Sequence, residues 1–205
     1  MGTVTSLQDH RLARQRKAAA ARGARPRATL FFDLRSPYTY LAAERADRLF
    51  ARLEWLPASS DALHATAPDE DGMRRVAERA RLLGLPLVWP EQPQHAVRGA
   101  MRVASLAAQR GCGGGFVLAA SRLAFCGGFD IDDPEILAEA AAAAGIGLRE
   151  ALAAAGDVAR DGPIEEAGRQ LLAGGASLLP ALRVGRMLFC GEDRLLEAAA
   201  ARAAV

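Results

Sequence analysis

The alternation of apolar and polar positions from residue 28 onward predicts short strands and amphipathic helices. Ala28–Leu34 is an apolar run with an aromatic pair, which is typical of a buried strand. A helix is predicted at Pro37–Arg52, where apolar residues recur at spacings of three and four, and a second strand at Leu53–Leu56. A strand, a helix and a strand with short connections form a βαβ unit, so the two strands should be parallel and the crossover right-handed.

A block of about six helices, without a predicted strand, follows between residues 60 and 172. These helices are Met73–Leu83, His95–Arg110, Phe116–Phe125, Glu135–Ala144, Leu148–Ala155 and Ile164–Ala173. Gly111–Gly115 lacks the Lys-Ser/Thr of a phosphate-binding loop and is interpreted as a turn between two helices. Strands return at Ser177–Val184 and Met187–Phe189, which form a hairpin, and Glu192–Ala204 is a final helix.

The formal net charge of +2 conceals an uneven distribution of charge. Residues 1–27 hold seven of the 26 basic residues and one of the 24 acidic residues, and we interpret them as a disordered basic extension. The other residues carry 19 basic and 23 acidic side chains, a net charge of −4, which argues against a nucleic-acid partner. No apolar run approaches the roughly 18 residues that cross a bilayer, so no membrane partner is expected.

The cysteines are Cys112, Cys126 and Cys190. An odd number without a Cys-x-x-Cys spacing argues against a disulfide framework and against a zinc site. We therefore expect a reducing, cytoplasmic compartment.

The acidic stretch Asp130-Ile131-Asp132-Asp133 invites a metal interpretation. Calcium sites need more oxygen ligands than this stretch offers, and a glycine at the turn. Asp133 as a helix N-cap with Pro134 at the first helical position explains the stretch without a metal, so no metal site is predicted.

Ser36 stands where the first strand ends and the first helix begins. Serine is a preferred N-cap and Pro37 fits the first helical position, so capping alone explains this pair. A helix N-terminus also offers unpaired N–H groups and the positive end of a dipole, which favour an anion such as a thiolate. Arg35 beside it either strengthens this local potential or is solvated.

The segment Asp33–Leu41, Asp-Leu-Arg-Ser-Pro-Tyr-Thr-Tyr-Leu, resembles a motif of the 2-hydroxychromene-2-carboxylate isomerase and kappa-class glutathione transferase family. That family belongs to the DsbA-like thioredoxin superfamily, whose disulfide-exchanging members carry Cys-Pro-x-Cys here. This chain has no sulfur at these positions, so dithiol–disulfide exchange is excluded at this site. Asp130–Leu137 and Phe189–Leu195 are similar to two further family segments, and the matches together extend from about residue 30 to 196.

The resemblance implies an α/β, thioredoxin-like fold, βαβ followed by ββα, with a large all-helical insertion as in DsbA-like proteins. Residues 28–59 and 174–205 would form the thioredoxin-like domain, and residues 60–173 the helical insertion domain.

The resemblance also implies a glutathione-dependent isomerase or transferase, in which Ser36 stabilises the thiolate of glutathione or another low-molecular-weight thiol. In the family the proline matching Pro180 is cis, the backbone before it pairs with the cysteinyl part of glutathione, and the closing motif meets the γ-glutamyl end. The residues implied to bind the thiol are Arg35, Pro37, Leu179, Pro180, Glu192 and Asp193. A small electrophilic or aromatic substrate and a homodimer are further implications.

Two departures from the family pattern leave other functions open. Phe189-Cys190 replaces the Trp that usually precedes the closing glycine, and Ser59-Ser60-Asp61 stands where the isomerases have a substrate-placing Asn. The alternatives are a redox-inactive, thioredoxin-like binding protein and a thiol oxidoreductase that uses Cys190 alone.

Overall fold

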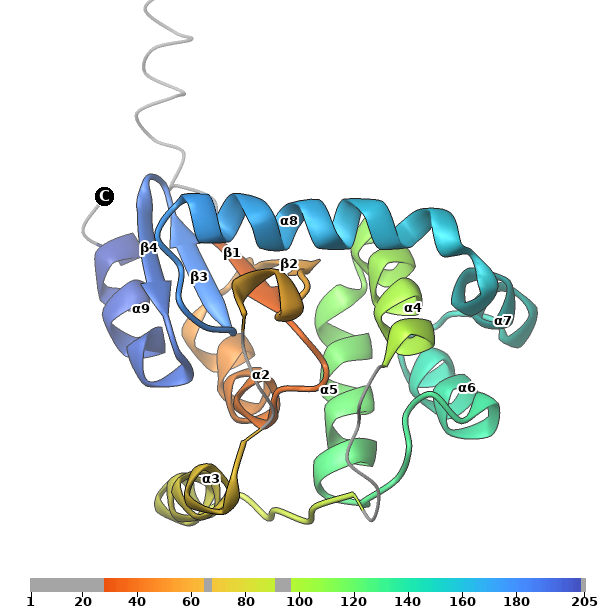
Figure 1. Ribbon diagram of the computed structural model, residues 1–205, viewed down its shortest axis with the longest axis horizontal. Coiled ribbons are helices and arrows are strands. Elements are labelled where there is room, and N and C mark those ends of the chain that lie inside the picture. Colours follow the sequence, from red (N-terminus) through yellow and green to blue (C-terminus); the bar gives the residue numbers. More distant parts are fainter. Residues whose placement is uncertain (1–27, 65–67, 91–96, 204–205) are drawn as a thin grey trace, which may run out of the picture.

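The structure is a computed structural model that describes residues 28–64, 68–90 and 97–203. Within these residues, a four-stranded sheet has the order β2-β1-β3-β4 (Figure 1). Its strands are β1 (Ala28–Phe32), β2 (Glu54–Pro57), β3 (Ala181–Val184) and β4 (Met187–Cys190). β1 is parallel to β2 and antiparallel to β3, and β3 and β4 form a hairpin. The predicted βαβ unit and closing hairpin are thus confirmed.

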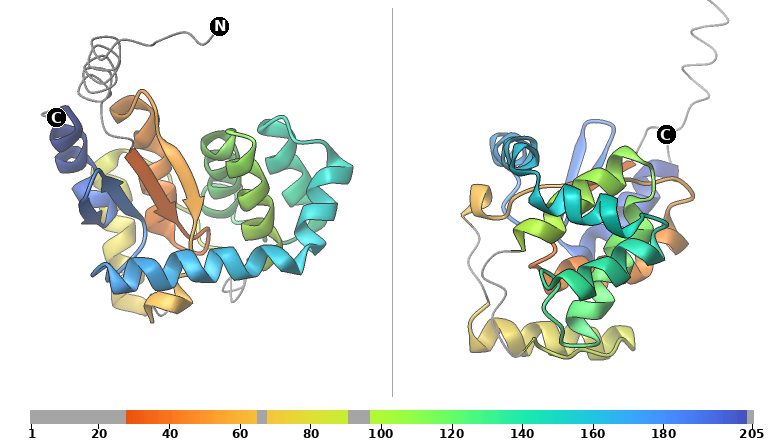
Figure 2. Two further views of the ribbon diagram at one scale, coloured as in Figure 1. Left: turned by 90° about the horizontal axis from the view of Figure 1, so that it is seen from above. Right: turned by 90° about the vertical axis from the view of Figure 1, so that its right-hand side faces the viewer.

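Six helices come between β2 and β3 in the described chain, and two others belong to the ends of the fold. The six are α3 (Glu70–Leu83), α4 (Arg98–Gln109), α5 (Gly113–Phe125), α6 (Pro134–Ala143), α7 (Leu148–Gly156) and α8 (Asp161–Ala173). The two others are α2 (Pro37–Leu49), which contacts α5, and α9 (Leu195–Ala203), which contacts α2 and β3. α8 extends from the helical side of the molecule across to the sheet (Figures 1 and 2).

Three short 3₁₀ turns complete the described elements: η1 (Asp61–Leu63), η2 (Val158–Arg160) and η3 (Glu192–Arg194). None of the described helices combines the length and apolar character needed to cross a membrane. The proposed basic extension lies outside the described residues. The domain boundaries proposed at residues 59–60 and 173–174 stay a prediction.

β1 is buried along its whole length because both faces of the sheet are covered. Successive side chains of a strand point to opposite faces. Leu30 and Phe32 belong to the main apolar core, which continues into α2, α4 and α5, whereas Phe31 belongs to a smaller core with Leu171 of α8. The residues of this apolar run are therefore buried in two separate cores, one on each face of the sheet.

Several predicted boundaries were wrong: α2 ends at Leu49 and not Arg52, and α3 and α8 each begin three residues earlier than predicted. Ser177–Pro180 is irregular and β3 begins only at Ala181, while the last helix begins with the 3₁₀ turn η3. The glycine-rich stretch is not entirely a turn, because α5 begins at Gly113.

The glycines at the start of α5 allow this helix to approach Trp55 of β2. A Cβ on Gly114 would lie 2.8 Å from the indole Nε1 of Trp55, and one on Gly113 would lie 2.9 Å from the Cβ of Trp55. Trp55 is itself buried and has no space to move away. Gly115 of the same run is exposed, and a Cβ there would have its nearest neighbour 4.0 Å away.

We expect Gly114→Ala to lower the free energy of unfolding by about 1–3 kcal/mol, since the added methyl group overpacks the contact with Trp55. Gly115→Ala is the matched control and should be neutral or stabilising by up to about 1 kcal/mol, because alanine favours the helix. Urea unfolding of both variants measures the difference. Equal stability of the two variants would contradict this account of the glycine run.

Candidate functional site

Ser36 occupies the turn between β1 and α2, as predicted. Its N–H donates to Asp33 O at 3.0 Å, and its carbonyl accepts the Thr39 N–H at 2.9 Å. Ser36 is the N-cap residue of α2 and Pro37 is the first helical residue, but the Ser36 hydroxyl caps no backbone N–H. It lies instead 3.4 Å from the carbonyl oxygen of Leu179. Capping by the side chain, the simplest explanation of this serine, is therefore not what the structure shows.

Leu179 and Pro180 bring the start of β3 beside Ser36, although 143 positions separate Ser36 from Leu179. The peptide bond between Leu179 and Pro180 is cis, as the resemblance implies. The carbonyl of Leu179 faces the Ser36 hydroxyl, and its N–H has no hydrogen-bond acceptor among the described residues. Buried backbone N–H groups rarely lack a partner, so this one is a candidate donor to a ligand.

Asp193 follows β4, the strand that forms a hairpin with β3. The N–H of Gly191 donates to Pro180 O at 2.8 Å, which joins the end of β4 to the start of β3. Gly191 has a φ of +103°, and a Cβ there would collide with the Oδ1 of Asp193. The exposed carboxylate of Asp193 is therefore folded back toward Gly191.

Glu192, the neighbour of Asp193, is turned inward and is only 3 % exposed. Its carboxylate pairs with Arg45 of α2 at 2.7 Å and with the Nε and Nη2 atoms of Arg79 on α3. The hydrogen bond to Glu192 is the main cause that raises the pKa of Arg79. Glu192 thus joins η3, α2 and α3, and the structure does not leave its carboxylate open toward Pro180.

Arg35 and Asp33 belong to a polar network behind the Ser36 turn. The buried carboxylate of Asp33 accepts hydrogen bonds from the Arg35 N–H at 2.9 Å and from the N–H and hydroxyl of Ser60. Arg35 also contacts Asp61 at 2.6 Å. Burial acts to lower the pKa of Arg35, but the attraction of Asp33 and Asp61 outweighs it, and the pKa is raised. Arg35 is a fixed cation beside Ser36.

A cavity of about 120 Å³ adjoins this network without including Ser36 or Pro180. It lies between the turn at Asp33 and Arg35, the segment after β2, and the first residues of α4 and α8. Val97, Met101 and Ile164 supply an apolar part of its wall. The cavity is smaller than a typical small-molecule pocket, which is about 300–1,000 Å³.

The three cysteines are free thiols at separate places. Cys190 is half-buried and packs against the smaller apolar core, which favours its interpretation as a small apolar residue. Cys126 lies 3.2 Å from the hydroxyl of Tyr40 on α2. Burial, followed by the hydrogen bond with Cys126, raises the pKa of Tyr40.

The acidic stretch at Asp130–Asp133 has a structural role. Asp133 caps α6, as predicted, by accepting hydrogen bonds from the Glu135 and Ile136 N–H groups. Asp132 accepts hydrogen bonds from two N–H groups at the start of α4, and burial raises its pKa. Within the described residues, no group of three or more His, Cys, Asp or Glu side chains is arranged to hold a metal ion.

Sequence reasoning missed four residues that shape the site: Asp33, Arg45, Ser60 and Arg79. Asp33 is the first residue of the motif that carries the family resemblance, and that position was an available signal. No sequence signal marked Arg45 and Arg79. The sequence has 26 basic residues, and nothing in it shows which of them pair with a buried carboxylate.

Comparison with known proteins bears on the fold. The chain matches a solved structure of 2-hydroxychromene-2-carboxylate isomerase with a TM-score of 0.67 and 18% identity, over 86% of this chain and 95% of that chain. It matches the cytosolic disulfide reductase DsbM from Pseudomonas aeruginosa, solved with glutathione, with a TM-score of 0.62 and 18% identity over the same shares. No curated protein matched.

A match to a family model assigns the chain to a family, whereas the distant structures show only its fold. The model described as the DSBA-like thioredoxin domain matches residues 28–201, which is nearly all of the described chain. The four-stranded sheet, the cis-proline beside the start of α2 and the helices inserted between β2 and β3 agree with that match. The chain therefore belongs to the DsbA-like thioredoxin family.

Proposed function

We propose that this protein is a glutathione-dependent isomerase or transferase in which Ser36 stabilises the thiolate of the bound thiol. The observation that carries the proposal is the position of the Ser36 hydroxyl. It is at the N-terminus of α2, it does not cap that helix, and it faces Leu179, whose N–H lacks a partner among the described residues. A hydroxyl donor and a backbone donor are thus available side by side.

These groups fit a small peptide thiol. The 3.4 Å contact between Ser36 and the Leu179 carbonyl is at the long limit of a hydrogen bond, so the hydroxyl loses little when it turns toward a sulfur atom. The N–H and C=O of Leu179 match the backbone groups of a cysteinyl residue, which would add to the β3 end as an extended strand. When bound, the thiol supplies a nucleophilic sulfur that adds reversibly to an electrophilic carbon.

The residues around the sulfur position lower the pKa of a thiol there. Ser36 donates a hydrogen bond to the charged form, and the first turn of α2 offers the positive end of its dipole. The charge of Arg35 is compensated by Asp33 and Asp61, so it adds little to this effect. The thiol proton leaves to solvent, so the site itself needs no general base. Reaction classes that require two protein thiols are not available at Ser36.

The electrophilic substrate would approach from the side of the Arg35 cavity, where Val97, Met101 and Ile164 form an apolar wall. At about 120 Å³ this cavity is smaller than the pockets that usually hold a small molecule, so it would enclose only part of an aromatic substrate. The homodimer and the cytoplasmic location implied by the sequence stay predictions.

Calorimetric titration with glutathione, followed by a screen of conjugated aromatic electrophiles, tests this function. Binding together with turnover supports it. Binding of glutathione or a peptide without any turnover would favour the redox-inactive binding protein, and turnover abolished by alkylation of Cys190 would favour the oxidoreductase. Absence of binding to every low-molecular-weight thiol would overturn the proposal.

Ser36→Ala should raise the pKa of the bound glutathione thiol by about one to two units. A hydrogen bond to a charged group contributes about 1.5–3 kcal/mol, and one pKa unit corresponds to about 1.4 kcal/mol. The ultraviolet absorbance of the thiolate, followed as a function of pH, measures this shift. Ser177→Ala removes an exposed hydroxyl near the same loop and should change nothing. The same thiol pKa in both variants would remove Ser36 from the mechanism.

Asp33→Ala should lower the free energy of unfolding by about 3 kcal/mol and weaken glutathione binding, because it removes the buried acceptor of the Arg35 N–H and of the Ser60 N–H and hydroxyl. The control is Asp61→Ala, which removes the largely exposed partner of Arg35 and should cost less than about 1 kcal/mol. Urea unfolding and calorimetry give the two readouts. A loss in the control as large as in Asp33→Ala would contradict this role of the buried carboxylate.

A further inference from the structure

The turn that leads from β1 to Ser36 contains one hydrogen bond to a distant helix. The N–H groups of Arg35 and Ser36 donate within the turn, to the carboxylate and the carbonyl oxygen of Asp33. The N–H of Leu34 donates instead to the sulfur of Met101 on α4, at 3.4 Å and across 67 positions of sequence. Leu34 is 0% exposed, so this N–H group cannot turn to solvent for another acceptor.

Packing alone does not explain a methionine at position 101. Met101 is only 6% exposed, and leucine fills nearly the same volume in a core at little cost. Leucine lacks the thioether sulfur, which is a weak acceptor. Among the described residues the Leu34 N–H has no other acceptor, and a buried N–H group without one is costly. The sulfur of Met101 therefore meets a specific requirement of the turn.

The side chain of Met101 also faces the cavity of about 120 Å³ that adjoins this turn. It shares the apolar wall of that cavity with Val97 and Ile164. The sulfur thus contacts the turn before Ser36, while the rest of the side chain lines the place where the electrophile would bind.

The position of the Ser36 hydroxyl depends on the peptide units that precede it. This hydroxyl lies 3.4 Å from the carbonyl oxygen of Leu179, and Leu34 is only two residues away from it along the chain. A rotation of the Leu34 peptide unit would move the hydroxyl relative to Leu179. The hydrogen bond to Met101 opposes that rotation.

We propose that Met101 positions the Ser36 hydroxyl through the Leu34 N–H and that the rest of its side chain is an apolar contact for an aromatic electrophile. This inference rests on the proposed function and adds to it a residue of the helices inserted between β2 and β3. Met101 is a positioning residue for the thiolate, since it acts through Leu34 and does not touch the bound sulfur. Only its own sulfur serves this first role, and only its apolar surface serves the second.

Two substitutions separate the two roles. Met101→Leu keeps the apolar surface and removes the acceptor, whereas Met101→Gln offers an amide oxygen as acceptor and makes the cavity wall polar. The pKa of the bound glutathione thiol, followed by its ultraviolet absorbance, should rise by about half a unit in Met101→Leu and return toward its original value in Met101→Gln.

The second role is measured by calorimetry with benzylideneacetone, a conjugated aromatic ketone, in the absence of thiol. Its affinity should be unchanged in Met101→Leu and about fourfold weaker in Met101→Gln, the factor for one buried methylene group. Should Met101→Gln fail to fold, Met101→Ala takes its place here, because it shortens the apolar wall and should weaken the binding where Met101→Leu does not.

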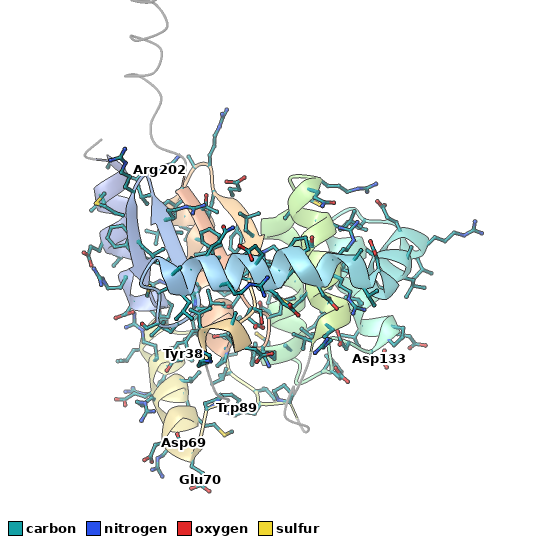
Figure 3. All side chains as sticks on the ribbon, turned by 45° about the horizontal axis from the view of Figure 1, so that its top comes forward. Tyr38, Asp69, Glu70, Trp89, Asp133 and Arg202 are labelled. Carbon is teal, nitrogen blue, oxygen red and sulfur yellow. The ribbon has the colours of Figure 1, made fainter. Side chains whose placement is uncertain are left out.

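Hydrogen exchange followed by NMR tests the bond itself without any ligand. The Leu34 amide should exchange about fivefold faster in Met101→Leu, the factor for the loss of one ordinary hydrogen bond. The matched control is Met73→Leu, because Met73 is half-buried in the first turn of α3 and its sulfur accepts no hydrogen bond among the described residues. Figure 3 shows this end of α3, marked by Asp69 and Glu70, on the side of Tyr38 that is away from the sheet. The control should leave all three measurements unchanged.

The outcomes separate this inference from the proposed function. If glutathione binds but its thiol pKa is the same in Met101→Leu as in the unaltered protein, the bond to Leu34 does not position the hydroxyl. The inference then fails, while the thiolate site at Ser36 stands. A raised thiol pKa that a folded Met101→Gln does not lower would also overturn it, because the sulfur would not be acting as an acceptor. Equal affinity of all variants for benzylideneacetone would overturn the second role. If no low-molecular-weight thiol binds to the unaltered protein, the proposed function fails and the inference fails with it.

Discussion

The antiparallel pairing of β1 with β3 is the constraint on which the rest of the structure depends. Phe31 is opposite Ala181 in this register, so the residues after β1 and the residues before β3 meet at one end of these two central strands. That end of the sheet holds Ser36 against Leu179. A shift of the register by one residue would exchange the two faces of β1 and move Phe31 out of the smaller core. Packing on both faces of the sheet thus fixes the geometry of the site.

Two buried carboxylates hold the ends of the site in place. Asp33 fastens the turn before Ser36 to the segment after β2, and Glu192 fastens η3 to α2 and α3. A buried carboxylate that loses its partners costs several kcal/mol, so each of them strongly disfavours other arrangements of the segments that it joins. Charge thus fixes the separation of distant segments at both ends of the site.

The sequence predicted elements better than the contacts between them. Apolar periodicity predicted β1, α2 and the hairpin because one or two faces of each are buried. It placed β3 too early, because the residues before Pro180 are apolar yet irregular, and it interpreted Gly113 and Gly114 as a turn because their reason, the indole of Trp55, comes from a distant strand. Ser36 and Pro180 were accessible through a motif, whereas the inward turn of Glu192 and its pairing with Arg79 depend on tertiary packing that no local pattern records.

A thioredoxin-like site without its own thiols needs a different source of specificity. When the reacting sulfur belongs to the protein, the fold places it; when it belongs to a ligand, the protein must recognise the rest of that ligand. The groups near Ser36 distinguish only a sulfur atom and a peptide unit, which many thiols share. On the proposed function, discrimination among thiols must then come from contacts with the rest of the ligand, away from Ser36.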